Sequence, residues 1–238
     1  SCSLSADDRE SDGMTSPVIA MEISQRDGGV AVRCPDGSAV VERLTSSSRR
    51  GDALMPAVES ICDRIDLSPQ DLRGIGVSIG PGGFTGLRIG IAAAKMLSWS
   101  LEIPLVAIPT ALLAAESAKD LNGLIAVALA SKDETCWLTL VEGSSGSRSI
   151  MGEGRLMEAA GFLRAVQPAA HLIADEHLPV SMCEHGLATR SPDFDPLVLL
   201  EMTERGLASG EHLDPMDLKP LYPREPEAVR LWDSRTGK

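Results

Sequence analysis

Aromatic residues are scarce in this chain of 238 residues: Phe, Trp and Tyr together make up 3% of it, with a single Tyr. Proteins that bind single-stranded nucleic acid commonly stack bases on aromatic side chains, so this composition argues against such a surface. Basic residues are fewer than acidic ones. The chain has 22 Lys and Arg and 34 Asp and Glu, which gives a formal net charge of −12. Phosphate contacts supply much of the affinity for nucleic acid. If RNA features in the biology of this protein, we therefore expect a partner to hold it.

The sequence also lacks paired cysteines and long apolar runs. Its five cysteines are far apart and none forms a C-x-x-C pair, which is typical of free thiols in a reducing compartment. No apolar stretch approaches the ~18 residues that span a bilayer. The N-terminus shows no basic-then-apolar signal pattern. These features predict a cytoplasmic protein without membrane contact.

Patterns that carry enzyme chemistry are missing too. The four histidines, His171, His177, His185 and His212, lie in the second half of the chain, and none forms H-x-x-x-H or H-E-x-x-H. No G-x-S-x-G sequence offers a hydrolase nucleophile. The sequence therefore predicts no catalytic residue, no metal site and no cofactor.

The apolar patterns between residues 17 and 118 predict the first of two lobes. Three strands open it and form an antiparallel beginning to a mixed sheet. Apolar residues recur at helical spacing from Leu54 to Ile65, so we expect a helix from Asp52 to about Asp66, with Asp52 as its N-cap. A buried strand, a helix, a strand and a further helix follow, over 74–80, 85–101, 104–109 and 110–119.

Residues 119–238 predict a smaller second lobe whose last segment returns toward the first. Its expected elements are strands over 123–130 and 134–143, a helix over 152–166, a strand over 170–175 and a helix over 192–211. Both lobes are interpreted as βββαβα-type mixed sheets with helices, which makes the chain an α/β protein. Residues 1–16 are polar and acidic and predict a flexible tail.

The sequence GIGVSIGPGGFTGLRIGIAAAKML, residues 74–97, places a glycine-rich turn between a strand and a helix. Such turns often cradle phosphate, because backbone N–H groups and the positive end of the helix dipole converge there. A P-loop needs G-x-x-x-x-G-K-[ST], and a dinucleotide fingerprint needs a third Gly where Thr85 stands. Since neither pattern is satisfied, phosphate binding by this turn is not favoured.

The helix after this turn contains two glycines, each of which costs about 1 kcal/mol relative to Ala. Close approach by another backbone can offset that cost. Two interpretations stay open: the glycine side lies on the protein's own sheet, or it meets a helix of another chain. That side holds Gly86, Gly90, Ala93, Ala94 and Leu97. The sequence places Ile89, Ala92 and Met96 on another side, expected to face a core.

The run GPGGFTGLRIGIAAAKML closely resembles the signature of the TsaB/YeaZ family, G-P-G-S-F-T-G-L-R-I-G followed by A-x-A-K-x-L. Gly83 stands where Ser is common. LMPAVESI is similar to the family's Leu-Leu-Pro helix, and PLYPREPEA to its closing Pro-x-Tyr-Leu-Arg sequence. The resemblance is strong from residue 17 to 118, weak from 120 to 210, and returns at 219–228.

The resemblance implies the two-lobed ASKHA fold of actin, hexokinase and Hsp70. It also implies a noncatalytic scaffold in the bacterial complex that makes N6-threonylcarbamoyladenosine (t6A) in tRNA. In that complex a TsaD-like transferase carries the chemistry and is bound directly, a TsaE-like ATPase takes part, and tRNA is reached only through the complex. When alone, the chain is expected to form a homodimer through the same surface.

The implied partner-binding surface combines two helices from each chain. Gly90→Leu is then expected to abolish TsaD binding while leaving the lobe folded. The residues expected on this surface are Leu54, Val58, Phe84, Thr85, Gly86, Leu87, Arg88, Gly90, Ala93, Ala94 and Leu97.

Two departures from related patterns bear on function. ASKHA phosphotransferases have an N-terminal Asp turn that helps to hold metal and phosphate, where this chain has Glu22 and Ser24. The Glu22 carboxylate is expected at the strand end, in solvent or in a turn. Ala130 stands where the family has an Asp. The absent Asp turn and the absence of a metal-ligand cluster favour the scaffold over the alternative, a stand-alone ASKHA nucleotide-binding enzyme or an M22 glycoprotease-like hydrolase.

Overall fold

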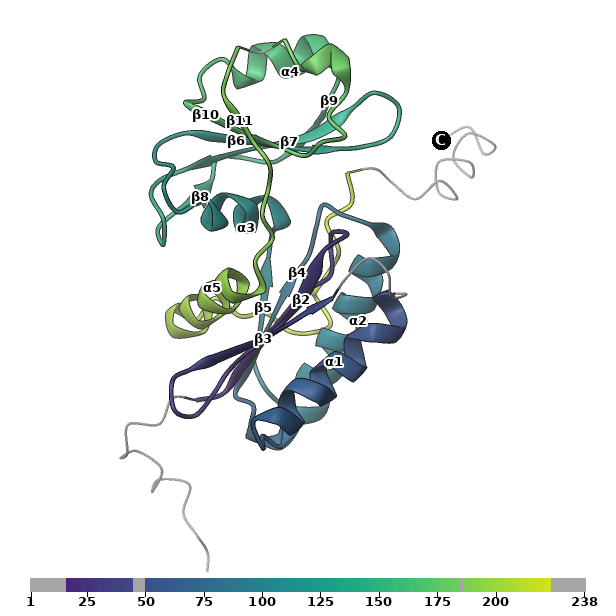
Figure 1. Cartoon of the computed structure of the whole chain (residues 1–238), viewed down its shortest axis with the longest axis vertical. Coiled ribbons are helices and arrows are strands. Elements are labelled where there is room, and N and C mark those ends of the chain that lie inside the picture. Colours follow the sequence, from purple (N-terminus) through teal and green to yellow (C-terminus); the bar gives the residue numbers. More distant parts are fainter. Residues whose placement is uncertain (1–15, 45–49, 185, 224–238) are drawn as a thin grey trace, which may run out of the picture.

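A computed structural model describes residues 16–44, 50–184 and 186–223. Within these ranges the chain forms two mixed sheets, with helices between them and on their outer faces (Figure 1). The predicted α/β class with two sheets is confirmed. Residues 1–15, which hold nearly all of the predicted acidic tail, and His185 lie outside the described residues.

The first sheet has five strands in the order β3-β2-β1-β4-β5. β1 (Val18–Glu22), β2 (Gly28–Arg33) and β3 (Ala39–Leu44) pair antiparallel, as predicted, whereas β4 (Gly74–Ser78) and β5 (Leu105–Ile108) add in parallel. β1 and β4 lie centrally and are buried along their whole length. Because both faces are buried, the two strands hold apolar residues or glycine at every position except Glu22 and Ser78 at their ends.

Helices α1 (Arg50–Arg64) and α2 (Phe84–Leu101) lie side by side on one face of this sheet (Figure 1). Their inner sides share one core with the sheet, which includes Ile19, Met21, Leu54, Ile61, Ile91 and Leu97. Helix α1 begins at Arg50, so the prediction that Asp52 is its N-cap is wrong. The apolar spacing that predicted the helix starts at Leu54 and carries no information about where the polar first turn begins.

The second sheet runs in the order β11-β10-β6-β7-β8, with β9 paired to β7. Its centre is the antiparallel pair of β6 (Ile125–Ala130) and β7 (Cys136–Glu142). β10 (His171–Ala174) and β11 (Thr189–Arg190) extend it in parallel. Two short 3-10 helices, Pro69–Asp71 in the first lobe and Val180–Met182 in the second, complete the connections.

The segment after β7 departs from the prediction of a helix over 152–166. β8 (Ser149–Ile150) and β9 (Arg155–Met157) pair with β7, and only α4 (Ala159–Val166) is helical. Gly154 accounts for part of the difference, because a Cβ at this position would clash with the indole of Trp137 on β7. The glycine lets the chain lie flat against the sheet where a helix could not.

Two helices are exchanged between the halves of the chain. α3 (Thr110–Ser117) follows the first sheet in sequence, yet its alanine-rich side shares a core with Ile125 and Val127 of the second sheet. α5 (Pro196–Ser209) follows the second sheet but covers the face of the first sheet opposite α1 and α2 (Figure 1). Each half therefore completes the core of the other.

After α5 the chain runs back along the first sheet, and residues 211–223 are called the return segment below. The backbone N–H of Leu213 donates to the carbonyl of Leu105 at 3.0 Å, and that of Leu221 donates to Ile79 at 2.7 Å. Between them the side chain of Leu218 is buried in the first core. This path brings the return segment to the start of α2.

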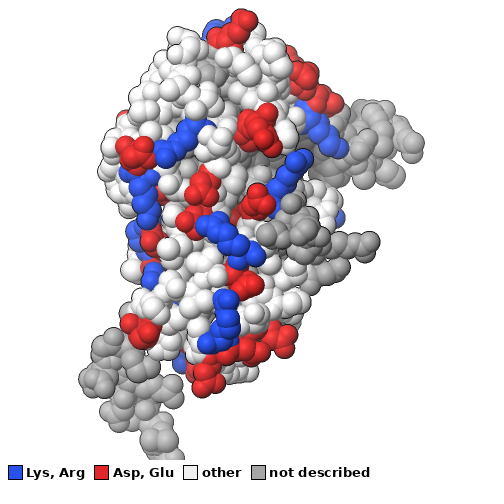
Figure 2. Space-filling model, viewed as in Figure 1, with Lys and Arg blue, Asp and Glu red and all other residues white. Residues whose placement is uncertain are grey.

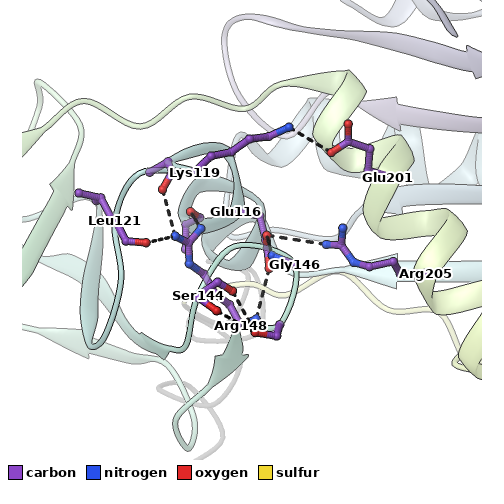
Figure 3. A network of polar contacts seen from close by, with 11 residues as sticks. Glu116, Lys119, Leu121, Ser144, Gly146, Arg148, Glu201 and Arg205 are labelled. Carbon is purple, nitrogen blue, oxygen red and sulfur yellow. Dashed lines mark hydrogen bonds and ion pairs between the residues drawn. The ribbon is translucent and has the colours of Figure 1, made fainter. Parts of the chain in front are cut away.

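A buried polar network joins the lobes where α3, α5 and the loop before β8 meet (Figure 3). Glu116 of α3, 3% exposed, accepts hydrogen bonds from the backbone N–H groups of Gly146 at 2.8 Å and Arg148 at 3.4 Å. Arg205 of α5 lies 3.8 Å from the same carboxylate. The guanidinium of Arg148 in turn donates to carbonyl oxygens at the end of α3, those of Ala115, Ala118 and Leu121.

Candidate partner-binding surface

The glycine side of α2 lies on the protein's own sheet. A Cβ on Gly86 would clash with the carbonyl oxygen of Ile23, and one on Gly90 would lie 2.9 Å from Cγ1 of Ile23. The glycines thus let the helix approach the end of β1 closely. Of the two interpretations of the glycine side, packing on the chain's own sheet is the one that the structure shows. Gly90→Leu is therefore expected to disturb the core, contrary to the prediction from sequence.

The opposite side of α2 is the exposed one. Ala92 is exposed and Met96 is 51% exposed, so the prediction that these two residues face a core is wrong. Ile89 is half-buried and packs against the first core, as predicted. Only glycine fits where the helix passes closest to Ile23, while the larger side chains of Ile91 and Leu97 are buried in the first core beside this contact.

The eleven residues predicted for the partner surface divide by burial. Phe84 is 47% exposed, and Thr85 and Arg88 are exposed at the start of α2. Eight are buried within the chain itself and could act on a partner only through the shape of the helix pair: Leu54, Val58, Gly86, Leu87, Gly90, Ala93, Ala94 and Leu97.

An exposed row of residues, called the α2 row below, follows the outer side of the helix. Its members are separated by four, three, four and three residues, the spacing by which one helix presents a continuous seam to another. Trp99 at its end is 81% exposed, and Met55 on the neighbouring α1 is 39% exposed. The row consists of Thr85, Ile89, Ala92, Met96 and Trp99. Sequence reasoning missed Trp99 and Met55, because the sequence alone left open which side of α2 faces outward.

The glycine turn before α2 is tied to its own lobe. The N–H of Gly83 donates to the carbonyl of Ser24 at 2.7 Å, and that of Gly80 donates to Oγ1 of Thr110 at 3.1 Å. Gly80 has a φ of 106°, in the left-handed region that favours glycine. Since these N–H groups already have partners, the turn fits a tight connection from β4 to α2 better than a phosphate cradle.

Glu22, at the end of β1, is fully buried, so the part of the prediction that placed it in solvent is wrong. Its Oε1 accepts from the backbone N–H of Ser24 at 2.7 Å and from the Ser24 hydroxyl at 2.6 Å. Oε2 and the nearby hydroxyl of Ser78 are buried without a hydrogen-bond partner among the described residues. Burial raises the pKa of the Glu22 carboxyl above its usual value, and this effect exceeds the opposing effect of the hydrogen bonds from Ser24.

This environment tests whether a metal and phosphate could sit at the strand end, as in ASKHA phosphotransferases. A metal–phosphate site needs an ionised carboxylate that points into an open cleft. Here the carboxyl points into the protein, and the turn closes over it, since a Cβ on Gly82 would clash with the carbonyl of Ser24. The residues present at this strand end do not fit such a group.

Ala130, which stands where the family has an Asp, and the described histidines do not come together in one site. Ala130 ends β6, where its N–H donates to Oδ2 of Asp175 at 2.7 Å. His177 and His212 are exposed and His171 is half-buried. Within residues 16–44, 50–184 and 186–223, no three His, Cys, Asp or Glu side chains are grouped closely enough to hold a metal ion.

Over the described part of the face in Figure 2, acidic and basic side chains are interspersed rather than gathered into a basic area. Among the described helices, none has the length and apolar character needed to cross a membrane.

Comparisons with known proteins agree with the sequence resemblance. A family model described as TsaD, tRNA N6-adenosine threonylcarbamoyltransferase, matches residues 45–154, which contain both α1 and α2. The tRNA threonylcarbamoyladenosine biosynthesis protein TsaB of Bacillus subtilis is 37% identical over 109 residues. The solved structure of YeaZ from Pseudomonas aeruginosa superposes with a TM-score of 0.75 at 20% identity, covering 87% of this chain and all of the other. In part of its sequence and in its fold, the chain is similar to proteins of the TsaB/YeaZ family.

The similarity to these relatives is uneven along the chain. The part aligned with the B. subtilis protein is 45% of the chain and about half, 47%, of that relative. An uncharacterized protein of Mycobacterium tuberculosis is 27% identical over 209 residues, 84% of the chain and 87% of that protein. The superposition on YeaZ confirms the predicted two-lobed ASKHA-like fold.

Proposed function

We propose that this chain is a noncatalytic scaffold of a complex that makes N6-threonylcarbamoyladenosine in tRNA. In this proposal it binds a TsaD-like transferase directly and works in the cytoplasm beside a TsaE-like ATPase. The observation that carries the proposal is the α2 row, which leaves Met96 51% and Trp99 81% exposed on one side of a helix. Large apolar side chains exposed in a continuous row generally mark a surface that another protein covers.

The chemistry of the row favours a helical partner. Its seam is apolar, and its spacing of 3.5 residues on average matches the way two helices interlock. Met55, 39% exposed on α1, lies on the adjacent helix and would widen the contact to two helices from this chain. Trp and Met are among the residues enriched at the centres of protein interfaces. These features support a four-helix interface with the transferase.

The noncatalytic part of the proposal rests on Glu22. Its carboxyl is buried and hydrogen-bonded to Ser24, at the position where an ASKHA enzyme would present an ionised carboxylate. We expect calorimetry with ATP and Mg²⁺ to show no binding by the purified chain. Tight binding without a partner would favour the stand-alone enzyme instead.

Binding to the cognate TsaD-like protein tests the proposal directly. We expect Met96→Glu and Trp99→Glu to weaken the dissociation constant by at least about tenfold, because each places a charge in an apolar seam. Val180→Glu is the matched control, since Val180 is 85% exposed in the second lobe, away from α2. Absence of binding by the wild-type chain, or wild-type affinity in both α2 variants, would overturn the proposal.

The same row accounts for the proposed homodimer. Without the transferase, two copies could cover their α2 rows around a two-fold axis. Sedimentation equilibrium is expected to show a dimer for the wild-type chain and a monomer for Trp99→Glu. A Trp99→Glu variant that stays dimeric would place the dimer contact elsewhere.

A further inference from the structure

The return segment ends in contact with the exposed start of α2. The hydroxyl of Tyr222 accepts a hydrogen bond from Nε of Arg88 at 3.2 Å. The Tyr222 and Phe84 rings lie 5.3 Å apart between centroids and are inclined by 31°. The guanidinium carbon of Arg88 lies 3.8 Å from the centroid of the Phe84 ring. These three side chains form one cluster, called the Tyr222 cluster below.

Backbone contacts fix the position of Tyr222 within this cluster. The preceding residue, Leu221, donates its N–H to the carbonyl of Ile79 at 2.7 Å. The carbonyl oxygen of Leu221 would lie 2.6 Å from a Cβ on Gly80. The glycine at this position therefore leaves room for the return segment. Leu218, 2% exposed, anchors the segment in the core. The return segment thus holds Tyr222 at one place beside α2.

Among the described residues, the guanidinium of Arg88 contacts Phe84 and Tyr222 but no carboxylate. It is exposed, and no carboxylate among the described residues lies within ion-pair distance of it. A guanidinium that is free to rotate loses side-chain entropy when a partner fixes it. Tyr222 and Phe84 already hold it by a hydrogen bond and a cation–π contact, which reduces that loss on binding. Arg88 also precedes Ile89 of the α2 row, so it adjoins the proposed interface.

This inference rests on the proposed function. We propose that Tyr222 is a positioning residue for partner recognition: it holds the guanidinium of Arg88 at the start of the α2 row, where that group meets a carboxylate of the TsaD-like partner. The return segment then forms part of the binding surface, although it is separated from α2 by more than a hundred residues of sequence.

A double-mutant cycle on the affinity for the cognate TsaD-like protein tests this role. We expect Arg88→Ala and Tyr222→Ala each to weaken binding by about tenfold. Tyr222→Phe, which keeps the ring and loses the hydroxyl, is expected to weaken it about threefold. In the Arg88→Ala background, Tyr222→Ala is expected to add nothing further, because its effect passes through Arg88. The salt dependence of binding should fall in the same variants, since a charge pair is screened by salt.

Met216→Ala is the control, because Met216 lies in the same segment and is 78% exposed. It is expected to bind as the wild-type chain does. Additive effects of Arg88→Ala and Tyr222→Ala, or unchanged affinity in Tyr222→Ala, would overturn the inference and leave the proposed function intact. If Tyr222→Ala melts early, the cycle with Tyr222→Phe decides in its place. If the wild-type chain does not bind the TsaD-like protein, the proposed function fails and this inference falls with it.

Discussion

The guanidinium of Arg148 donates a hydrogen bond to the carbonyl oxygen of Ala118 at 3.0 Å and so closes the C-terminal end of α3. Arg148 comes from the loop before β8, whereas α3 is the helix that leads out of the first sheet. A cation at a helix C-terminus stabilises the carbonyl groups that have no partner within the helix. Because Arg148 is 7% exposed, water cannot replace it there. This contact anchors the connection between the two lobes.

Arg148→Met is expected to lower the free energy of unfolding by about 2–4 kcal/mol, because it leaves buried carbonyl oxygens without donors. Urea unfolding followed by circular dichroism measures the change. Arg190→Ala is the control, because Arg190 forms an ion pair with Asp120 whose side chains are 48% and 69% exposed. Exposed pairs contribute about 0–1 kcal/mol. Equal losses in the two variants would contradict a special role for Arg148.

Glu22→Gln is expected to raise the melting temperature at pH 7 to 8. The folded chain holds the Glu22 carboxyl with a raised pKa, so around neutral pH it binds a proton more readily than the unfolded chain does. Stability then falls as the pH rises from the usual pKa of Glu through the raised one. Gln keeps the acceptor for Ser24 and removes the ionisation.

Melting curves of the wild-type and Glu22→Gln proteins between pH 4 and 8 check this sign. The difference in melting temperature is expected to grow as the pH rises and to be smallest near pH 4, where the carboxyl is mostly neutral in both states. A difference that is constant over this range, or that favours the wild-type protein at pH 8, would show that Glu22 is ionised in the folded chain.

Gly86→Ala is expected to destabilise the protein by about 2 kcal/mol or more, although Ala is the better helix former by about 1 kcal/mol. The new Cβ would clash with the carbonyl oxygen of Ile23, which belongs to the backbone and cannot move aside. Gly161→Ala in α4 is the matched control, because its Cβ would meet only Sδ of Met157, at 3.4 Å. We expect that variant to be as stable as the wild-type protein or more so. A neutral Gly86→Ala would mean that α2 does not lie this close to β1.

Isolated protein is expected to bind tRNA with a dissociation constant weaker than about 10 µM at physiological salt, because its net charge of −12 opposes approach to phosphates. Fluorescence polarisation with labelled tRNA measures this. Adding the TsaD-like protein should bring tRNA into the complex. Tighter binding by the chain alone would show that RNA recognition is not left to a partner.

Local sequence signals were enough for the outline of the first lobe. The strands before residue 45 and the helix after the glycine turn are long, strongly patterned elements, and α2 starts at Phe84, one residue from the predicted Thr85. The short strands β8, β9 and β11 have two or three residues each and exist only through pairing with neighbours. No local pattern in so short a segment distinguishes a strand from a loop or a helix.

The side of α2 that faces outward could not be derived from hydrophobicity alone. Small residues on one side and large apolar residues on the other both suit a core, and only the clash of a Cβ on Gly86 with the backbone at Ile23 decides between them. Glu22 was misplaced for a related reason. A carboxyl at a strand end usually points to water, and its burial depends on the turn that Gly82 and Gly83 fold over it. The contact between Arg88 and Tyr222 joins residues too far apart in sequence for any local pattern.

Because α3 and α5 are exchanged, a cut between the two sheets is not expected to give two fragments that each fold alone. A gene split near Gly123 would leave the first fragment without α5, so one face of the first sheet would be uncovered. The same fragment would keep α3, whose alanines would lack the second sheet that they pack against. The second fragment would carry the complementary defects. Expressed separately, the fragments are expected to aggregate; expressed together, they are expected to reassemble into one soluble particle. The exchange of α3 and α5 therefore predicts that each fragment folds only when the other is present.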